Sequence, residues 1–395
     1  MTGKPDTRQR VSVWSWTNPR TRGAAFQIAA LAFVAVALWY LASTAHANLE
    51  RQHIATGFGF LDRTAGFSII QSMISYSEES SYGRAFLVGL LNTLTVASIG
   101  TVIAIFIGFV IGVARLSSNW LVAKLAAVYV ETLRNVPLLL QLFFWYFAIL
   151  RPLPGPARSL TLLPNVWVNN RGVILPALET TSSTAIFFVA LAIALLGAWG
   201  LRRWAHARQI RTGTMFPIAR VNAVIIVGLP AIVWAITGAP LLLAPAKLGT
   251  FDFEGGLRLL PEFVALLLGL SLYTAAFIAE IVRAGIQSVS RGQSEAAHAL
   301  GLTGGQTLRL VIIPQALRVI IPPLTSQILN LTKNSSLAVA IAYPDLVSVF
   351  AGTVLNQTGQ AIEVISITMA VYLAISLATS YAMNLYNARV ALVER

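Results

Sequence analysis

Runs of about 20 apolar residues recur along the chain, and each is long enough to cross the roughly 30 Å hydrocarbon core of a bilayer as a helix. They lie near residues 25–45, 86–114, 120–150, 183–200, 221–244, 262–285, 316–343 and 364–388. Only 11% of the 395 residues are charged and 56% are hydrophobic, whereas a soluble domain carries about 25% charged residues. The sequence therefore predicts an all-α, polytopic membrane protein with about eight transmembrane helices.

Two of these runs contain residues that interrupt an apolar helix. Proline removes a backbone donor and crowds the preceding turn, and charged groups are costly at membrane depth. We therefore predict that both runs are broken or re-entrant. The interrupting residues are Glu131, Arg134 and Pro137 in the third run, and Pro322, Pro323 and Lys333 in the seventh.

The placement of Lys and Arg predicts the orientation of the chain. With the N-terminus in the cytoplasm, most basic residues, including those of the loop at 202–220, fall on the cytoplasmic side. A Lys/Arg excess on that side is what sets membrane topology. Both termini are predicted to be cytoplasmic.

Composition and motifs exclude several classes of function. The chain has no cysteine, which removes thiolate catalysis and Cys-ligated metal centres. Its four histidines stand apart from any catalytic or metal-binding motif, and no glycine-rich nucleotide cradle with its lysine occurs. The net charge of +13 forms no nucleic-acid-binding pattern. We expect no enzyme activity, no metal, no cofactor and no nucleic-acid partner.

The segment 290–314 combines several helix-boundary features. Ser290 with Gln293 and Thr303 with Gln306 fit capping boxes, and Gly301 suits a left-handed helix end. Pro314 can then end or kink the second helix. This pattern predicts a helix-turn-helix elbow on the cytoplasmic surface. A docking surface for a partner protein and a well-capped loop fit the pattern equally well.

The same segment resembles a known family. The run Glu295-Ala296-Ala297, then Gly301, then Val311-Ile312-Ile313-Pro314 resembles the EAA signature of the permeases of bacterial ABC importers. That signature reads Glu-Ala-Ala, three residues, Gly, nine residues and Ile-x-Leu-Pro. The chain departs from it mildly, with Val311 in place of Ile and Ile313 in place of Leu.

Other segments narrow the resemblance to one branch of these permeases. They are similar to the histidine/glutamine-type polar amino acid permeases: Gly89–Leu94, Ala114–Ser117, Tyr129–Gln141 and Lys333–Leu337. The similarity covers roughly 84–150 and 262–388. The extra first span, the stretch at 54–61 and the long middle insertion resemble the general L-amino-acid subgroup.

The resemblance implies a domain organisation. Residues 1–84 would hold a cytoplasmic arm, the first transmembrane helix and a periplasmic segment. Residues 85–388 would form the transmembrane core of a type I (MetI-like) ABC importer. That core would contain an insertion at about 151–260, adding a pair of helices, and a cytoplasmic coupling loop at 287–315.

The resemblance also implies partners and a location in the cell inner membrane. The coupling loop would dock in a groove of an ATP-binding subunit. The importer would contain two copies of that subunit, which bind the ATP. A second homologous permease and a periplasmic amino-acid-binding protein would complete the importer. The docking residues would be Glu295, Ala296, Ala297, Gly301, Arg309 and Pro314.

Ionisable and polar residues at membrane depth are the candidates for a substrate path. If a helix restarts at Pro322, Lys333 lies about 16 Å deep, where its ammonium could meet a substrate carboxylate, pair with Glu131 or Glu280, or bind backbone carbonyls. The substrate-path candidates are Lys333, Asn334, Asn330, Arg134, Asn135 and Gln141.

Two E-x-x-R pairs could instead be structural. Glu131 with Arg134 and Glu280 with Arg283 each place an acid and a base on one helix face. We interpret both as intramembrane ion pairs, and a role in gating or substrate contact is the alternative.

The sequence therefore predicts a permease subunit of an ATP-driven importer that moves L-amino acids, with broad specificity, from periplasm to cytoplasm. The alternative is an ion-coupled secondary amino acid transporter, which would work alone and use buried acids as ion sites. A membrane scaffold without a transport path is a further alternative.

Overall fold

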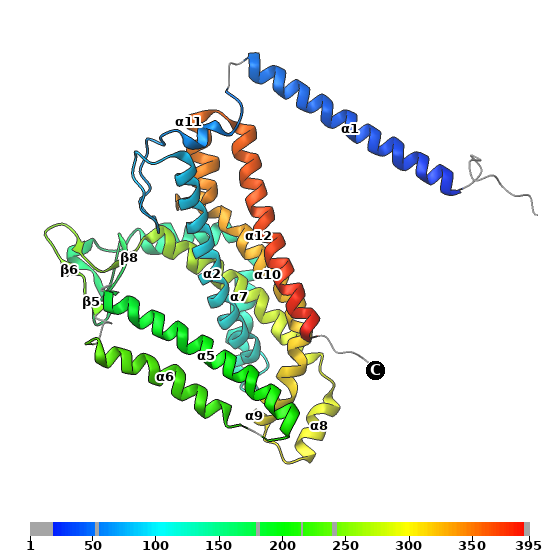
Figure 1. The fold of residues 1–395 in the computed structure, drawn as a ribbon, viewed down its shortest axis with the longest axis vertical. Coiled ribbons are helices and arrows are strands. Elements are labelled where there is room, and N and C mark those ends of the chain that lie inside the picture. The colour runs from blue at the N-terminus through cyan, green and yellow to red at the C-terminus, as the bar shows by residue number, and fades with distance from the viewer. Residues whose placement is uncertain (1–18, 52–54, 179–181, 215, 239–242, 391–395) are drawn as a thin grey trace, which may run out of the picture.

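The computed structural model describes residues 19–51, 55–178, 182–214, 216–238 and 243–390 (Figure 1). Within these ranges the chain is mostly helical. Seven helices are long and apolar enough to cross a membrane, or eight if a bent pair counts as one span. The prediction of an all-α fold with about eight spans is thus confirmed.

The helices follow the apolar runs of the sequence. They are α1 (Pro19–Arg51), α2 (Tyr82–Ala114), α3 (Trp120–Asn135), α4 (Leu138–Phe143), α5 (Ser182–Thr212), α6 (Ile218–Ile236), α7 (Pro261–Gln287), α8 (Arg291–Ala299), α9 (Gly304–Thr307), α10 (Ile313–Asn334), α11 (Leu355–Thr358) and α12 (Ala361–Val390). Short 3₁₀ turns lie at Phe58–Asp62, Pro156–Arg158 and Ser335–Ile341, and π-helical turns at Phe144–Leu150, Leu308–Ile312 and Val347–Val354.

The core of the bundle is the contact between α2 and α7. Small residues recur every four positions on α2, where a Cβ added at Gly108 would lie 2.6 Å from Ile278 Cβ, and one at Gly112 would lie 2.7 Å from the Ala279 carbonyl oxygen. Ser271 Oγ lies 3.4 Å from the Gly100 carbonyl oxygen. Close backbone approach of this kind holds helices together in lipid, where the hydrophobic effect does not drive one helix against another.

The third apolar run is broken, as predicted. α3 and the helix from Leu138 to Leu150 meet at an angle of 106°. Pro137 has no N–H for the carbonyl of Leu133, and Gln141 Nε2 donates to that carbonyl oxygen instead, at 2.9 Å, and to the Val136 carbonyl oxygen at 2.9 Å. The Gln141 side chain therefore caps the carbonyls that the break exposes.

The seventh run is not broken at its proline pair, which corrects the sequence interpretation. α10 continues through Pro322 and Pro323 as far as Asn334. The carbonyls that lose their donors belong to Arg318 and Val319, and both residues lie on the exposed face of the helix. The backbone is left-handed at Ala342, with φ of 59°, but the chain continues along α2 as far as Gln357, which accepts from Tyr82 Oη, and it turns back at Gly359, before α12.

The insertion contains strands as well as the predicted pair of helices. β1 (Leu160–Leu163), β2 (Val166–Asn169), β3 (Gly172–Leu175) and β8 (Leu257–Leu259) form an antiparallel sheet in the order β1-β2-β3-β8. β4 (Ala177–Leu178) pairs with β5 (Leu243–Ala244), and β6 (Lys247–Leu248) pairs with β7 (Phe253–Glu254). The sheet joins the two ends of the insertion.

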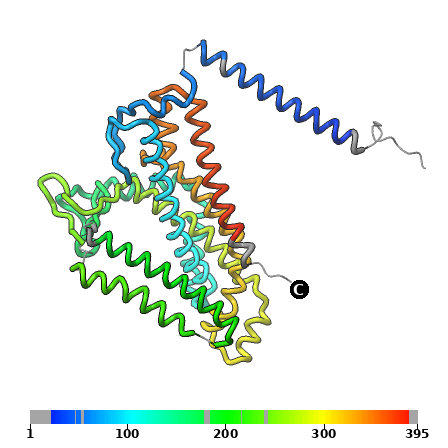
Figure 2. The backbone as a smooth tube through the Cα atoms, in the orientation of Figure 1, coloured from blue at the N-terminus to red at the C-terminus, as the bar shows by residue number. Residues whose placement is uncertain are grey.

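The helices α5 and α6 form a hairpin beside the bundle, and α1 extends away from it (Figures 1 and 2). The face of α5 that is buried in the hairpin carries alanines, namely Ala190, Ala194, Ala198 and Ala205. Asn222 Nδ2 donates to the Ala198 carbonyl oxygen at 3.2 Å and ties α6 to α5. Most other large apolar side chains of the hairpin are exposed, as expected for lipid-facing helices.

Candidate functional site

The predicted elbow is formed by α8 and α9, and its turn depends on Gly301. This glycine has a φ of +80°, a conformation that L side chains rarely adopt. The Leu302 N–H donates to the Ala297 carbonyl at 3.1 Å, and the Gly301 N–H donates to the His298 carbonyl at 2.9 Å. This pair of hydrogen bonds is the Schellman motif, which ends a helix and turns the chain sharply.

The second half of the elbow starts with the predicted capping box. The Thr303 side chain accepts from the Gln306 N–H, and the Gln306 side chain accepts from the Thr303 N–H at 2.9 Å. The first predicted box does not form, because the Ser290 side chain makes no capping hydrogen bond. Gln293 Oε1 instead accepts from Gln315 Nε2 at 3.0 Å, which links α8 to α10.

Most of the predicted docking residues of the elbow are exposed. Glu295, Ala296, Arg309 and Pro314 are exposed, and Leu300 is 82% exposed. Ala297 is buried and faces the protein. The arrangement brings the predicted docking residues onto one protruding feature at the end of the bundle. Pro314 is the second residue of α10 and directly follows the π-helical turn at Leu308–Ile312.

A polar cavity of about 240 Å³ lies between α7 and α10. Its lining residues are Tyr273, Thr274, Phe277, Gln327, Asn330 and Asn334. The first three lie near the middle of α7, so the cavity lies near half the height of the bundle. The structure therefore brings the predicted residues Asn330 and Asn334 together in one cavity. Sequence analysis missed the α7 residues, since Tyr273 and Thr274 are uncharged within an apolar run.

Arg134 lies beside this cavity. Its guanidinium carbon is 5.1 Å from the centroid of the Phe277 ring, and that ring lines the cavity. Among the described residues Arg134 forms no ion pair with Glu131, so the first predicted E-x-x-R pair is not made. Glu131 and Asn135 are exposed on α3. Gln141 lies apart, with its amide donors used at the helix break.

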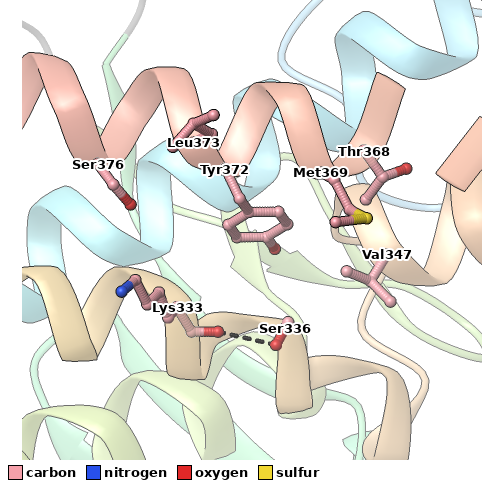
Figure 3. A pocket seen from close by; sticks show the side chains of 8 residues that line it. All are labelled: Lys333, Ser336, Val347, Thr368, Met369, Tyr372, Leu373 and Ser376. Atoms are coloured by element: carbon pink, nitrogen blue, oxygen red, sulfur yellow. Dashed lines mark hydrogen bonds between the residues drawn. The ribbon is translucent and has the colours of Figure 1, made fainter. Parts of the chain in front are cut away.

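Lys333 lies in a separate open groove between α10 and α12, with a volume of about 430 Å³ (Figure 3). The figure shows Tyr372 pointing from α12 into the space between the helices, with Lys333 and Ser336 on the facing chain. Ser336 Oγ donates to the Lys333 carbonyl at 2.7 Å. Within the described part of the chain the Lys333 ammonium forms no ion pair, with Glu131, Glu280 or any other acid.

The second predicted ion pair, between Glu280 and Arg283, is present, and Arg115 joins it as a third member. Arg283 Nε donates to Glu280 Oε1 at 3.1 Å, and Arg115 at the end of α2 pairs with the other carboxylate oxygen. Arg283 also donates to Gln287 Oε1 at 2.6 Å. This cluster lies where α2 and α7 end and joins the two core helices, so it has a structural part in the bundle.

A buried polar cluster at the far end of the bundle was not predicted. Thr93 Oγ1 accepts from the Leu346 N–H at 3.0 Å, and Asp345 Oδ1 accepts from the Ser348 N–H at 2.8 Å. Asn92 Nδ2 donates to the Pro344 carbonyl at 2.9 Å. Asp345 is fully buried. Its position as a lone acid in an apolar stretch is the sequence feature that indicates its burial.

Comparisons with known proteins agree with these observations. Residues 100–392 match the family described as the binding-protein-dependent transport system inner membrane component. The chain is 53% identical to the putative amino-acid ABC transporter permease protein YhdX of Escherichia coli K12, over 96% of this chain and 97% of that protein. It is 50% identical to the general L-amino acid transport system permease protein AapQ of Rhizobium johnstonii, over 97% and 96% of the two chains.

Two further relatives are more distant. The glutamate/glutamine/aspartate/asparagine transport system permease protein BztB of Rhodobacter capsulatus is 44% identical over 95% of each chain. A solved amino acid ABC transporter with histidines aligns with 78% of this chain and 95% of its own, at 22% identity and a TM-score of 0.47. On the family match and the full-length relatives, the chain belongs to the inner membrane components of binding-protein-dependent transport systems.

Proposed function

We propose that this chain is the permease subunit of an ATP-driven importer that carries L-amino acids, with broad specificity, across the bacterial inner membrane into the cytoplasm. The observation that carries the proposal is the capped elbow of α8 and α9, which protrudes from one end of the bundle. The full-length likeness to amino acid permeases supports the importer over an ion-coupled transporter.

In this proposal the elbow docks on an ATP-binding subunit. Glu295, Ala296 and Arg309 are exposed there, and Gly301 fixes the angle between the two helices. Two ATP-binding subunits, a second permease and a periplasmic amino-acid-binding protein complete the assembly. The subunits that bind ATP shift the permease between two arrangements through their contacts with the elbow. Both termini then lie in the cytoplasm.

The substrate path runs past the cavity between α7 and α10. Amide groups of Gln327, Asn330 and Asn334 line it together with Thr274, and such groups bind both the ammonium and the carboxylate of an amino acid. Arg134 stands next to Phe277 with no acid paired to it in the described residues. It therefore supplies the positive charge for a substrate carboxylate.

Lys333 offers a second positive charge for the substrate, in the separate groove between α10 and α12. Its ammonium has no carboxylate partner in the part of the chain that the structure describes, and a lone charge within a membrane-spanning helix is costly. The groove is open along its side, which leaves room for a substrate or for the second permease. Gln141 has no part in this path, because its donors hold the broken helix.

Co-purification from native cells tests the elbow. Gly301→Asp places a side chain at a φ of +80° and is expected to lose the ATP-binding subunit while the protein still inserts. Gly359→Asp is the matched control, because Gly359 has a φ of +67° and open space around it, away from the elbow. Equal recovery of the ATP-binding subunit with both variants contradicts the docking role.

A further inference from the structure

The loop end of the α5–α6 hairpin carries an unusual concentration of unpaired positive charge. Arg202, Arg203, Arg208, Arg211 and Arg220 lie there, and all are exposed. No Asp or Glu occurs between residues 180 and 251. Within the described ranges none of these guanidinium groups makes an ion pair or a hydrogen bond to a protein acceptor. Five donors on each arginine are therefore available to a ligand.

The length of α5 places these arginines at the edge of the membrane. The helix has 31 residues and is about 46 Å long at 1.5 Å per residue. The first charge, Arg202, comes about 30 Å along it, which matches the thickness of the hydrocarbon core. The remaining turns, as far as Thr212, extend about 15 Å into the headgroup layer and beyond it.

Aromatic rings hold the cluster at that level. The guanidinium carbon of Arg203 lies 4.0 Å from the Trp199 ring centroid, and that of Arg208 lies 5.4 Å from the Trp204 ring centroid. Both tryptophans are half exposed, and tryptophan prefers the membrane interface. Trp204 also packs edge-on against Phe216, with centroids 5.6 Å apart, which joins α5 to the segment before α6.

We propose that this end of the hairpin binds the headgroup phosphates of anionic phospholipids. Arginine pairs well with phosphate oxygens in a forked geometry, and basic clusters next to a transmembrane helix are attracted to anionic leaflets. The apolar sides of α5 and α6 are exposed along their length, so acyl chains can lie against the same helices whose arginines hold the phosphate. An acidic protein surface would contact the arginines but would leave these apolar sides uncovered.

The binding site lies at the same end of the molecule as the elbow (Figure 1). A lipid held there fixes the depth of the hairpin, which otherwise packs mainly on itself through its alanine face. The insertion thereby anchors the permease in the membrane, whichever solute is transported and apart from the substrate path.

Native mass spectrometry of the purified full-chain complex tests the proposal, with phosphatidylglycerol and phosphatidylcholine of equal chain length as probes. The test variant is Arg203→Gln with Arg208→Gln and Arg211→Gln. At about 1 kcal/mol per charge, three lost charges weaken phosphatidylglycerol binding about 100-fold. The matched control removes three exposed charges elsewhere, with Arg63→Gln, Arg158→Gln and Lys247→Gln, and is expected to bind as the unmodified protein does.

Several results would overturn the proposal. One is equal binding of phosphatidylglycerol and phosphatidylcholine. Another is an equal loss of phosphatidylglycerol binding in both triple variants. The third is displacement of the lipid by soluble glycerol phosphate at the same concentration, which would indicate a soluble phosphate ligand. Loss of the ATP-binding subunit with unchanged lipid binding would assign the cluster to a protein partner. Replacing the same arginines with lysine keeps the charge and is expected to retain most of the binding, which separates this effect from misfolding.

Discussion

The α2–α7 core and the α5–α6 hairpin are both pairs of membrane helices, yet they are held together differently. In the core, backbone approaches backbone at Gly108 and Gly112, and a three-residue ionic cluster links the helix ends. In the hairpin, an alanine face and the Asn222 hydrogen bond join the helices, and the arginines form no ion pair with an acid among the described residues. The difference indicates that the core keeps a fixed geometry, while the hairpin relies on its surroundings.

Replacing a glycine with leucine should give the largest difference in unfolding free energy between the core and the hairpin. Leucine at Gly108 collides with Ile278 and with the Ala275 carbonyl, 2.9 Å from the new Cβ, and is expected to cost about 3 kcal/mol or more of unfolding free energy. Leucine at Gly197 on α5 meets nothing within 4 Å and should change it by less than about 0.5 kcal/mol. Thermal unfolding in detergent measures both. Equal unfolding midpoints for the two leucine variants would contradict the difference between core and hairpin.

Removing a side-chain hydrogen bond should also destabilise the bundle more than the hairpin, but by a smaller difference in unfolding free energy. Gln141→Leu leaves the carbonyls of Leu133 and Val136 without their donor and is expected to destabilise by about 2–3 kcal/mol. Asn222→Leu removes only one 3.2 Å hydrogen bond to a helical carbonyl, with an expected loss below about 1 kcal/mol. A larger loss in the Asn222 variant, in the same unfolding assay, would reverse our ranking of the two regions.

The ionic cluster of Arg115, Glu280 and Arg283 is expected to contribute less to the unfolding free energy than the Gln141 hydrogen bonds at the helix break. Glu280→Gln leaves Arg115 and Arg283 without their shared carboxylate. The side chains are 16% to 29% exposed, so solvent screens the loss to about 1–2 kcal/mol. Arg203→Gln in the hairpin removes a charge that has no acidic partner among the described residues. It removes only the contact with the Trp199 ring and should cost less than about 1 kcal/mol in detergent. A salt titration of the unfolding midpoint checks the comparison, because screening should reduce only the Glu280 effect.

The smallest effect is expected in the sheet of the insertion. Asp252 is partly desolvated, which acts against its charged form, but hydrogen bonds from Arg171 and the Phe253 N–H, with the charge of Arg258, lower its pKa below 3.8. A lowered folded-state pKa gives stability that is present above the unfolded value and is lost as pH falls through the folded value. Asp252→Asn should cost less than about 1 kcal/mol, because both of its arginine partners, Arg171 and Arg258, are exposed.

Hydrogen exchange of the β3 and β8 amides measures that change. Protection should decrease in the Asp252→Asn variant at neutral pH, and in the unmodified protein only below about pH 3.8. Loss of protection already at pH 6 in the unmodified protein would contradict the assignment.

Much of the fold could be predicted because lipid imposes a length on each helix. The break at Pro137 and the turn at Gly301 were also predictable, since each depends on one residue with restricted backbone chemistry. Pro322 and Pro323 misled us, because the carbonyls they leave free belong to residues on an exposed helix face. Whether a proline breaks a helix depends on such surroundings.

Other features depend on contacts between distant segments. β3 pairs with β8 across the whole α5–α6 hairpin, and strands of three or four residues have too short a pattern to be recognised alone. In the site, Asn330 and Asn334 were predicted from their place near Lys333, whereas the structure puts them with Tyr273 and Thr274 of α7. The partners of a polar residue follow from helix packing, which the sequence does not display.

The most direct test of the account is amino acid uptake into proteoliposomes that hold either the chain alone or the complex purified with it. We expect uptake of labelled L-amino acids only with the complex and only with ATP present, and its loss in Gly301→Asp but not in Gly359→Asp. Uptake by the chain alone, driven by an ion gradient without ATP, would contradict the account.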